Sequence, residues 1–218
     1  MDLPLLAELA LNGTLTGLCY SLVALGIVAD VATQRGDTRY LLQRGLDALR
    51  FPGRPGLQAL MTAAQVDPTH LSTETIGFQL GPRLNALGRL DDASLAVELL
   101  TTSERALALQ IAQQLEVLNA QRKQLQDQIT MAALRQVEAN PSWLEFEALV
   151  VLGDGWHPGL LGIVAGRLAE LYNRPAVVLA QKVGEPAKGS ARSVPGVDIG
   201  AAIAACADLL LAHGGHPG

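Results

Sequence analysis

Apolar residues dominate the first thirty positions of the chain. The segment from Leu3 to Ala32 ends in the uninterrupted apolar run Val23-Ala-Leu-Gly-Ile-Val-Ala, which is followed by Asp30. A short run of this kind is typical of a buried strand or of the end of a buried helix. We therefore expect a buried element here, with one carboxylate emerging at its end.

Two short helices and a loop are predicted next. Leucines at helical spacing indicate a helix from Asp37 to Leu49, and Phe51-Pro-Gly-Arg-Pro-Gly56 interrupts the pattern before a second helix from Leu57 to Ala64. The stretch GFQLGPRLNALGR, residues 77–89, interleaves three glycines and a proline with two arginines. This composition predicts a loop whose backbone can approach a ligand closely.

A long helix is predicted in the middle of the chain. From Thr102 to Glu138 there is no proline or glycine, and apolar residues recur at steps of three, four and seven. Such a helix would be roughly 50 Å long, which suits a connection between two domains. We expect domains at 1–100 and 142–218, joined by a helix over 101–141.

The last part of the chain alternates strand and helix patterns. Ala148–Leu152 and Ala176–Ala180 are β-rich runs, and Leu160–Tyr172 between them is amphipathic. This predicts one βαβ unit and an α/β fold. Asp198 is placed to cap a closing helix that continues to Leu211 and ends at Gly214 and Gly215.

Composition and charge narrow the functional classes. The net charge of -5 excludes a broad basic surface that would hold nucleic acid by counterion release alone, so any such contact must be local. Polar residues and glycines dilute the first apolar run, and no Lys or Arg precedes Arg35, so we expect no membrane span or signal peptide. Cys19 and Cys206 form neither a disulfide framework nor a zinc site, and we interpret both as buried. The chain is expected to be cytoplasmic.

Two segments of the last domain have a composition suited to binding phosphate. The turn that contains His157 lies between a strand and a helix, where backbone N–H groups favour an anion, although an ordinary tight turn is an alternative. Lys188-Gly-Ser190-Ala-Arg192-Ser193 combines hydroxyls with cations, and strand alternation places Ser190 and Arg192 on one face. A polar, soluble sheet edge is the alternative for this stretch.

Other candidate residues are ambiguous when taken singly. Asp30 suits a metal ligand or a helix cap. Arg83 and Arg89 could hold a phosphate bidentately or form surface ion pairs. His213 and His216 have too few carboxylates or cysteines beside them for a metal site, so we interpret this end as a helix cap with one imidazole facing a ligand.

The order of the motifs resembles one family. VALGIVADV, GPRLNALGRL with DDASLAVELL, GWHPGLLGIVAGRLAE, KGSARSVPG and HGGHPG follow one another as in the RecJ exonucleases of the DHH phosphoesterase superfamily. The resemblance covers nearly the whole chain. It implies the C-terminal portion of a DHH domain, a long connecting helix, and an α/β DHHA1 substrate-binding domain with a small mixed sheet.

The resemblance also implies an activity and its residues. The family hydrolyses single-stranded DNA from the 5′ end with two Mn²⁺ or Mg²⁺ ions, in recombination and repair, and single-strand-binding protein or a helicase is an expected partner. Asp30 matches a metal-ligand motif of the family. Arg83 or Arg89, with Ser190 and Arg192, would hold phosphate, and His157 is carried over to the same role. Gly214, Gly215 and His216 match the Gly-Gly-His motif.

The sequence departs from the family in its metal-binding motifs. It contains no Asp-His-His and no Asp-x-Asp sequence, and one carboxylate cannot hold two ions. We therefore expect a truncated chain that is inactive alone. Two alternatives remain open: a non-catalytic DHHA1 module that binds nucleic acid, and a DHH-family phosphodiesterase acting on short oligonucleotides or cyclic dinucleotides.

Overall fold

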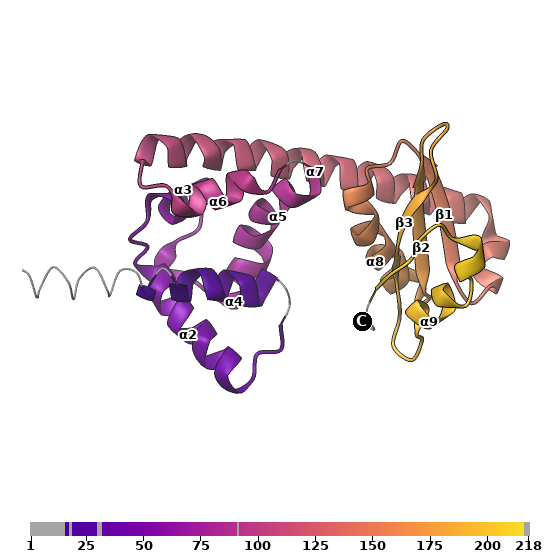
Figure 1. Ribbon diagram of the computed structural model, residues 1–218, viewed down its shortest axis with the longest axis horizontal. Coiled ribbons are helices and arrows are strands. Elements are labelled where there is room, and N and C mark those ends of the chain that lie inside the picture. Colours follow the sequence, from indigo (N-terminus) through magenta and orange to yellow (C-terminus); the bar gives the residue numbers. More distant parts are fainter. Residues whose placement is uncertain (1–15, 18, 30–31, 91, 216–218) are drawn as a thin grey trace, which may run out of the picture. The chain divides into compact units, whose positions relative to one another are not determined.

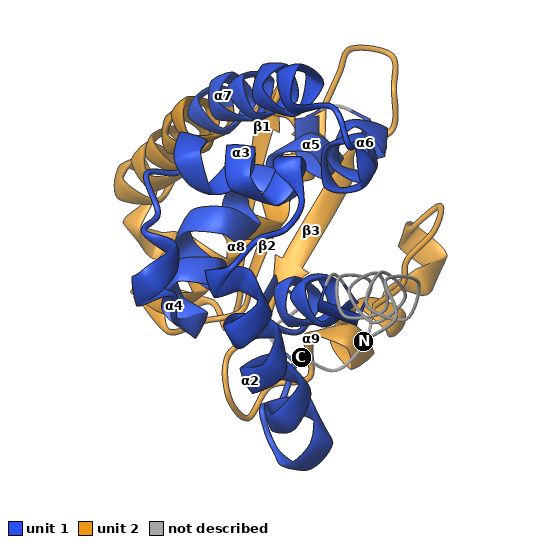
Figure 2. Cartoon of the chain, turned by 90° about the vertical axis from the view of Figure 1, so that its left-hand side faces the viewer, with its two compact units in different colours: residues 1–121 blue, residues 122–218 orange. Residues whose placement is uncertain are grey.

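The computed structural model describes residues 16–17, 19–29, 32–90 and 92–215 (Figure 1). The chain divides into two compact units, residues 1–121 (unit 1) and 122–218 (unit 2), coloured separately in Figure 2. The boundary falls inside one uninterrupted helix, α7 (Arg105–Ala139), which confirms the long helix that the pattern from Thr102 to Glu138 predicted.

The described part of unit 1 is helical. Leu42, Leu46 and Leu49 form the buried face of its α2, as the leucine spacing predicted, and they join a core to which α7 contributes Ile111 and Leu115. In chain order the elements are a helix over residues 16–17 and 19–29, α2 (Gly36–Arg50), α3 (Pro55–Ala63), the 3-10 helix η1 (Pro68–His70), α4 (Thr73–Thr75), the π-helix η2 (Ile76–Leu80), α5 (Gly81–Leu90), α6 (Ser94–Thr101) and the first part of α7.

Glycines let the helices of unit 1 pack backbone against backbone. A Cβ at Gly45 in α2 would overlap the Cβ of Ala24 and the carbonyl oxygen of Tyr20 in the preceding helix. A Cβ at Gly56 in α3 would overlap the carbonyl oxygen of Leu99 in α6. Because these two positions have no side chain, the paired helices can approach each other this closely.

The predicted loop from Gly77 to Arg89 is wrong, because this stretch lies in a continuous helical segment from α4 through η2 to α5. The amide of Gly81 donates to the carbonyl of Ile76, five residues back, which is the π-helical bond. This wide turn directly precedes Pro82, which has no N–H to continue an α-helical ladder. A Cβ at Gly77 would lie 3.4 Å from Val28 Cγ1, so this glycine lies close to the helix that contains Val28.

Unit 2 is an α/β domain with a small mixed sheet, as predicted. The strand order is β1-β2-β3, with β1 and β2 parallel in the register Leu149↔Ala176 and β3 antiparallel to β2 in the register Ala176↔Arg192. Helix α8 packs on this sheet (Figure 1). The elements after α7 are η3 (Pro141–Glu145), β1 (Leu149–Asp154), η4 (Pro158–Leu160), α8 (Leu161–Tyr172), β2 (Ala176–Gln181), β3 (Lys188–Arg192), α9 (Ile199–Ala204) and η5 (Ala207–Leu209).

The closing helix is shorter than predicted. Asp198 does cap α9, since its Oδ1 accepts from the amide of Ala201 at 2.9 Å. The helix ends at Ala204, however, and Gly214 and Gly215 lie in irregular, exposed chain rather than in a helix cap. The alanine-rich stretch has no buried residue, so packing does not extend the helix beyond its own propensity.

The two cysteines do not lie where the sequence predicted. Cys19 and Cys206 are exposed, so their interpretation as buried residues is wrong; a small apolar side chain does not by itself determine which face it occupies. The apolar run before Asp30 is helical through residue 29, which excludes the strand alternative. Asp30 itself lies outside the described residues. Within the part of the chain that the structure describes, no helix is long and apolar enough to span a membrane.

Candidate anion-binding site on α8 and β3

Ser190 and Arg192 share one face of β3, as strand alternation predicted, and both side chains lie against α8. A Cβ built at Gly162 would be 3.0 Å from Arg192 Nη2 and 3.1 Å from Ser190 Oγ. One turn further along α8, a Cβ at Gly166 would be 3.8 Å from Arg192 Cγ. The Arg192 side chain therefore runs along the helix from Gly166 toward Gly162, in the first turn.

The guanidinium of Arg192 is held by neutral partners. Its Nη1 donates to Ser190 Oγ at 3.2 Å and to the carbonyl oxygen of Ala191 at 2.8 Å. Among the described residues, no carboxylate forms an ion pair with it. Arg192 is exposed and Ser190 is half-buried, so both can be reached from solvent. The positive charge is thus fixed in position but not neutralised.

The first turn of α8 adds to the positive potential at this place. Gly162 is the second residue of the helix, where the macrodipole has its positive end. A guanidinium beside that end adds to the positive potential, and the two together favour the binding of an anion. Hydroxyl and guanidinium donors together suit a phosphate oxygen. Lys188, exposed at the start of the same face of β3, adds a second cationic group.

His157 caps the turn that leads into α8. Its Nδ1 accepts from the amide of Gly159 at 3.2 Å, at the start of η4. The imidazole therefore binds the N–H of Gly159, which is one of the backbone donors that the sequence predicted to be available to a phosphate. Before it, Gly155 has φ +66°, and the ring of Trp156 covers Gly153 so closely that a Cβ there would overlap it.

Arg83 and Arg89 lie in unit 1, on α5. Arg83 faces Glu116 of α7, with Nε 2.5 Å from Oε1 and Nη2 3.1 Å from Oε2, and its Nη1 donates to the carbonyl oxygen of Gln79 at 2.6 Å. Nη1 and Nη2 thus have hydrogen-bond partners, whereas Nε lies within ion-pair distance of Oε1 without forming a hydrogen bond. Arg89 is half-buried and also has a partner within the protein. Glu116 gave no signal in the sequence, because its partner is 33 residues away.

The structure does not describe Asp30, the one predicted metal ligand, or His216, a predicted substrate contact. Among the described residues, no group of three His, Cys, Asp or Glu side chains could hold a metal ion. The described side chains by themselves therefore do not fit the two-metal centre that the resemblance implies.

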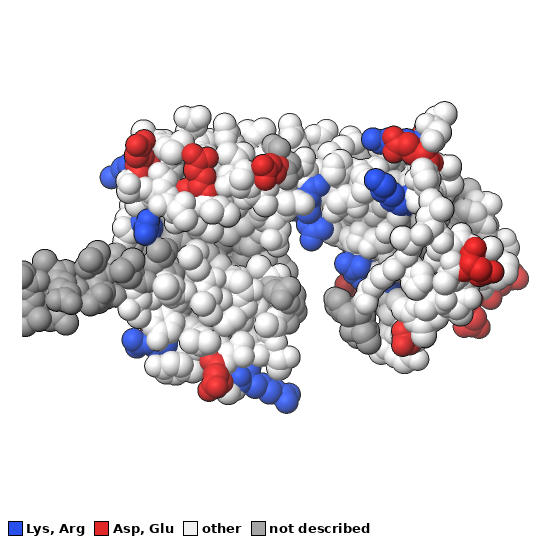
Figure 3. Space-filling model, viewed as in Figure 1, with Lys and Arg blue, Asp and Glu red and all other residues white. Residues whose placement is uncertain are grey.

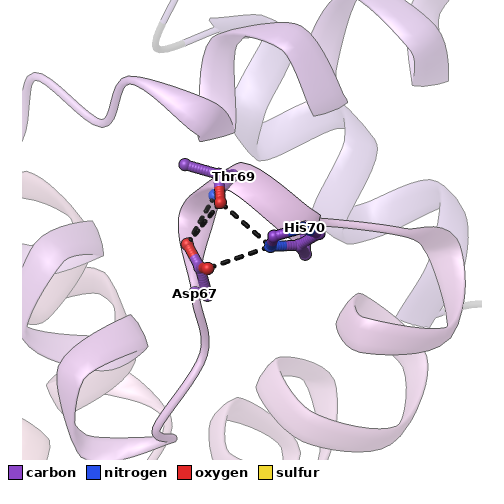
Figure 4. A network of polar contacts seen from close by, with 3 residues as sticks. All are labelled: Asp67, Thr69 and His70. Carbon is purple, nitrogen blue, oxygen red and sulfur yellow. Dashed lines mark hydrogen bonds and ion pairs between the residues drawn. The ribbon is translucent and has the colours of Figure 1, made fainter.

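A polar network that the sequence did not reveal surrounds His70 (Figure 4). Asp67 Oδ1 accepts from the amide and hydroxyl of Thr69 at 2.9 and 2.7 Å, and Oδ2 contacts His70 Nδ1 at 2.9 Å. The His70 contact and then the Thr69 bonds lower the pKa of Asp67 from 3.8 to about 2. The network caps η1 and is far too exposed to form an enclosed site.

Comparisons with known proteins identify the class of the chain. Residues 145–218 match the DHHA1 domain family. The chain is 38% identical over 209 residues to single-stranded-DNA-specific exonuclease RecJ of Bacillus subtilis (strain 168), covering 95% of this chain and 26% of that protein. It is 36% identical over 203 residues to the RecJ of Escherichia coli (strain K12), covering 89% of this chain and 35% of that protein.

A solved structure agrees with these sequence matches. The crystal structure of RecJ in complex with Mg²⁺ from Thermus thermophilus superposes with a TM-score of 0.80 at 34% identity, covering 92% of this chain and 30% of that one. Residues 145–218 of unit 2 are thus similar to a DHHA1 domain. The chain as a whole is homologous to one part of RecJ, as its motifs predicted, and spans about a quarter to a third of the curated relatives' length.

Proposed function

We propose that this chain binds the phosphate backbone of single-stranded DNA through Ser190 and Arg192, as the substrate-binding part of a RecJ-like 5′-to-3′ exonuclease of recombination and repair. The observation that carries the proposal is the Arg192 guanidinium, held beside Ser190 and the first turn of α8 with no carboxylate partner among the described residues. The curated relatives are named for action on single-stranded DNA.

A local site agrees with the charge of the molecule. The net charge is -5, and on the face shown in Figure 3 basic and acidic side chains are interspersed over both units. A surface of this kind does not attract a polyanion as a whole, so binding depends on a few well-placed donors. Arg192, Ser190 and Lys188 are such donors.

Hydrolysis is proposed from the homology, not from the described side chains. Relatives have been solved with Mg²⁺ and with Mn²⁺, and Asp30 is our candidate ligand for such an ion. Residues 1–100 would be the C-terminal portion of the DHH domain, 101–141 the connecting helix and 142–218 the DHHA1 domain. Arg83, Arg89, His157 and the Gly214-Gly215-His216 motif remain candidates for substrate contact. Single-strand-binding protein and a helicase remain candidate partners.

The test is a binding titration with a 5′-phosphorylated, fluorescent single-stranded oligonucleotide at several salt concentrations. Arg192→Ala should weaken binding by about 1–3 kcal/mol, because a charge-assisted contact to phosphate is lost. Arg167→Ala is the matched control, since Arg167 is an exposed arginine of α8 whose side chain pairs with Glu170. Equal affinities of the two variants would reject the site.

The same preparation, incubated with Mn²⁺, separates the remaining functional classes. Binding without cleavage would favour a substrate-binding part or a non-catalytic DHHA1 module. Cleavage of single-stranded DNA would show that this chain suffices for catalysis. Cleavage confined to short oligonucleotides or cyclic dinucleotides would favour the phosphodiesterase alternative.

A further inference from the structure

We infer that Gly162 is a positioning residue for Arg192: the absence of a side chain at this position allows the guanidinium to lie against the first turn of α8, where it can donate to a phosphate. The inference rests on the proposed function of Arg192. It assigns a role to a residue that carries no functional group of its own.

The contacts that a Cβ would make at position 162 distinguish Gly162 from a helical glycine that has no role in positioning another side chain. The Cβ that any other residue would introduce lies 3.0 Å from Arg192 Nη2 and 3.1 Å from Ser190 Oγ. Both distances are shorter than an ordinary carbon contact of about 3.5–4.0 Å. The atoms that must yield are the two donor groups proposed to bind phosphate, and no backbone atom of another element lies as close. A side chain at 162 would therefore displace the donors themselves.

Gly166 provides an internal comparison on the same face of the same helix. A Cβ there would lie 3.8 Å from Arg192 Cγ, at ordinary van der Waals distance from the aliphatic stem of the side chain. Neither glycine has a positive φ, so alanine suits the backbone at both positions. The two sites thus differ in which part of Arg192 they touch.

Stability and binding are expected to respond in opposite directions at position 162. The end of an arginine side chain is flexible and can move away from a new methyl group at little cost. Replacing a helical glycine by alanine also lowers the entropy of the unfolded chain. Gly162→Ala should therefore fold with a midpoint of thermal unfolding at or above that of the wild type, while its guanidinium is pushed off the helix.

The experiment is a double-mutant cycle on the full chain, with the 5′-phosphorylated oligonucleotide as the probe. We expect Gly162→Ala to weaken binding about five- to tenfold, as for the loss of one charge-assisted hydrogen bond. Gly166→Ala should bind as the wild type does. In an Arg192→Ala background, Gly162→Ala should weaken binding much less, because the guanidinium is gone and only Ser190 Oγ remains to be displaced.

Each outcome separates the role of Gly162 from that of Arg192. If Gly162→Ala weakens binding equally in both backgrounds, the glycine acts on the fold and not through Arg192, and the inference is overturned. If Gly162→Ala binds normally while Arg192→Ala does not, the inference fails and the phosphate site stands. If Arg192→Ala itself binds normally, the proposed role of Arg192 in phosphate binding is rejected, and the inference about Gly162 is rejected with it. Circular dichroism and thermal unfolding of each variant show that any loss of binding occurs in folded protein.

Discussion

Arg83 and Glu116 join α5 to α7 through an ion pair in which Nη2 donates to Oε2 at 3.1 Å and Nε lies 2.5 Å from Oε1 without forming a hydrogen bond. The arginine side chain is only 14% exposed, and its remaining nitrogen binds the carbonyl of Gln79 in the π-helix. Arg83, which lies in a family motif, thus connects the π-helix and α5 to the long helix α7 in this structure.

Glu116→Gln should destabilise the chain by about 1–2 kcal/mol, because it leaves a largely buried guanidinium without its counter-charge. Urea unfolding measures the change. Glu170→Gln is the control, since Glu170 pairs with Arg167 at 3.9 Å on the surface and should cost less than about 0.5 kcal/mol. A similar, small effect of both substitutions would contradict a structural role for the pair. Loss of DNA binding by Arg83→Ala at unchanged stability would support Arg83 as the phosphate ligand that its motif implies.

His157 should act as a cap in a way that asparagine can replace. His157→Ala is expected to lower the free energy of unfolding by about 1 kcal/mol, because the amide of Gly159 loses its acceptor. His157→Asn should recover most of that loss, since an asparagine oxygen can accept the same bond. Thermal unfolding compares the variants. If the asparagine variant is stable but binds DNA more weakly, His157 also contacts the substrate.

The carboxyl of Asp67 makes stability depend on pH in a defined range. Its pKa is lowered in the folded chain to about 2, from an ordinary value of 3.8, by the bonds from His70 and Thr69. The ionised form therefore stabilises the folded state fully above the ordinary pKa, and this contribution is lost as the pH falls through about 2. The stability difference between wild type and Asp67→Asn should shrink over that range. A difference that stays constant would show that the charge of Asp67 does not matter.

Two glycines of unit 1 should respond oppositely to alanine. Gly56→Ala would place a methyl group into the carbonyl of Leu99, and we expect a loss of about 2–4 kcal/mol because backbone must move. Gly88→Ala on α5 would meet no described atom within 4 Å, so it should stabilise by up to about 1 kcal/mol through helix propensity. Chemical denaturation tests both. Equal effects would show that α3 and α6 are not in backbone contact.

Patterns of apolar residues were sufficient for the parts of the fold with strong periodicity. The absence of proline and glycine predicted α7, and two β-rich runs around an amphipathic segment predicted the parallel pair β1 and β2. Strand alternation correctly placed Ser190 and Arg192 on one face. These features depend on local spacing, which the sequence displays directly.

Features that depend on tertiary packing were not predicted. The glycines and proline of residues 77–89 indicated a loop, but Gly77 packs against Val28 and a π-helical turn accommodates Pro82. The partner of Arg83 lies on another helix, and neither residue signals the other. In the sequence, Gly162 is an ordinary member of an amphipathic helix, since only the folded chain brings Arg192 against it. Long-range proximity of this kind has no period in the sequence.

The stacking of Trp156 on Gly153 provides a natural optical probe. Both tryptophans of the chain, Trp143 and Trp156, lie in unit 2, so fluorescence excited at the indole absorption edge reports on that unit alone. Trp156 is adjacent to His157, whose turn leads directly into α8. Emission from an indole pressed against bare backbone changes when that turn opens to water. Unfolding of unit 2 can therefore be followed within the whole chain, separately from the tryptophan-free unit 1.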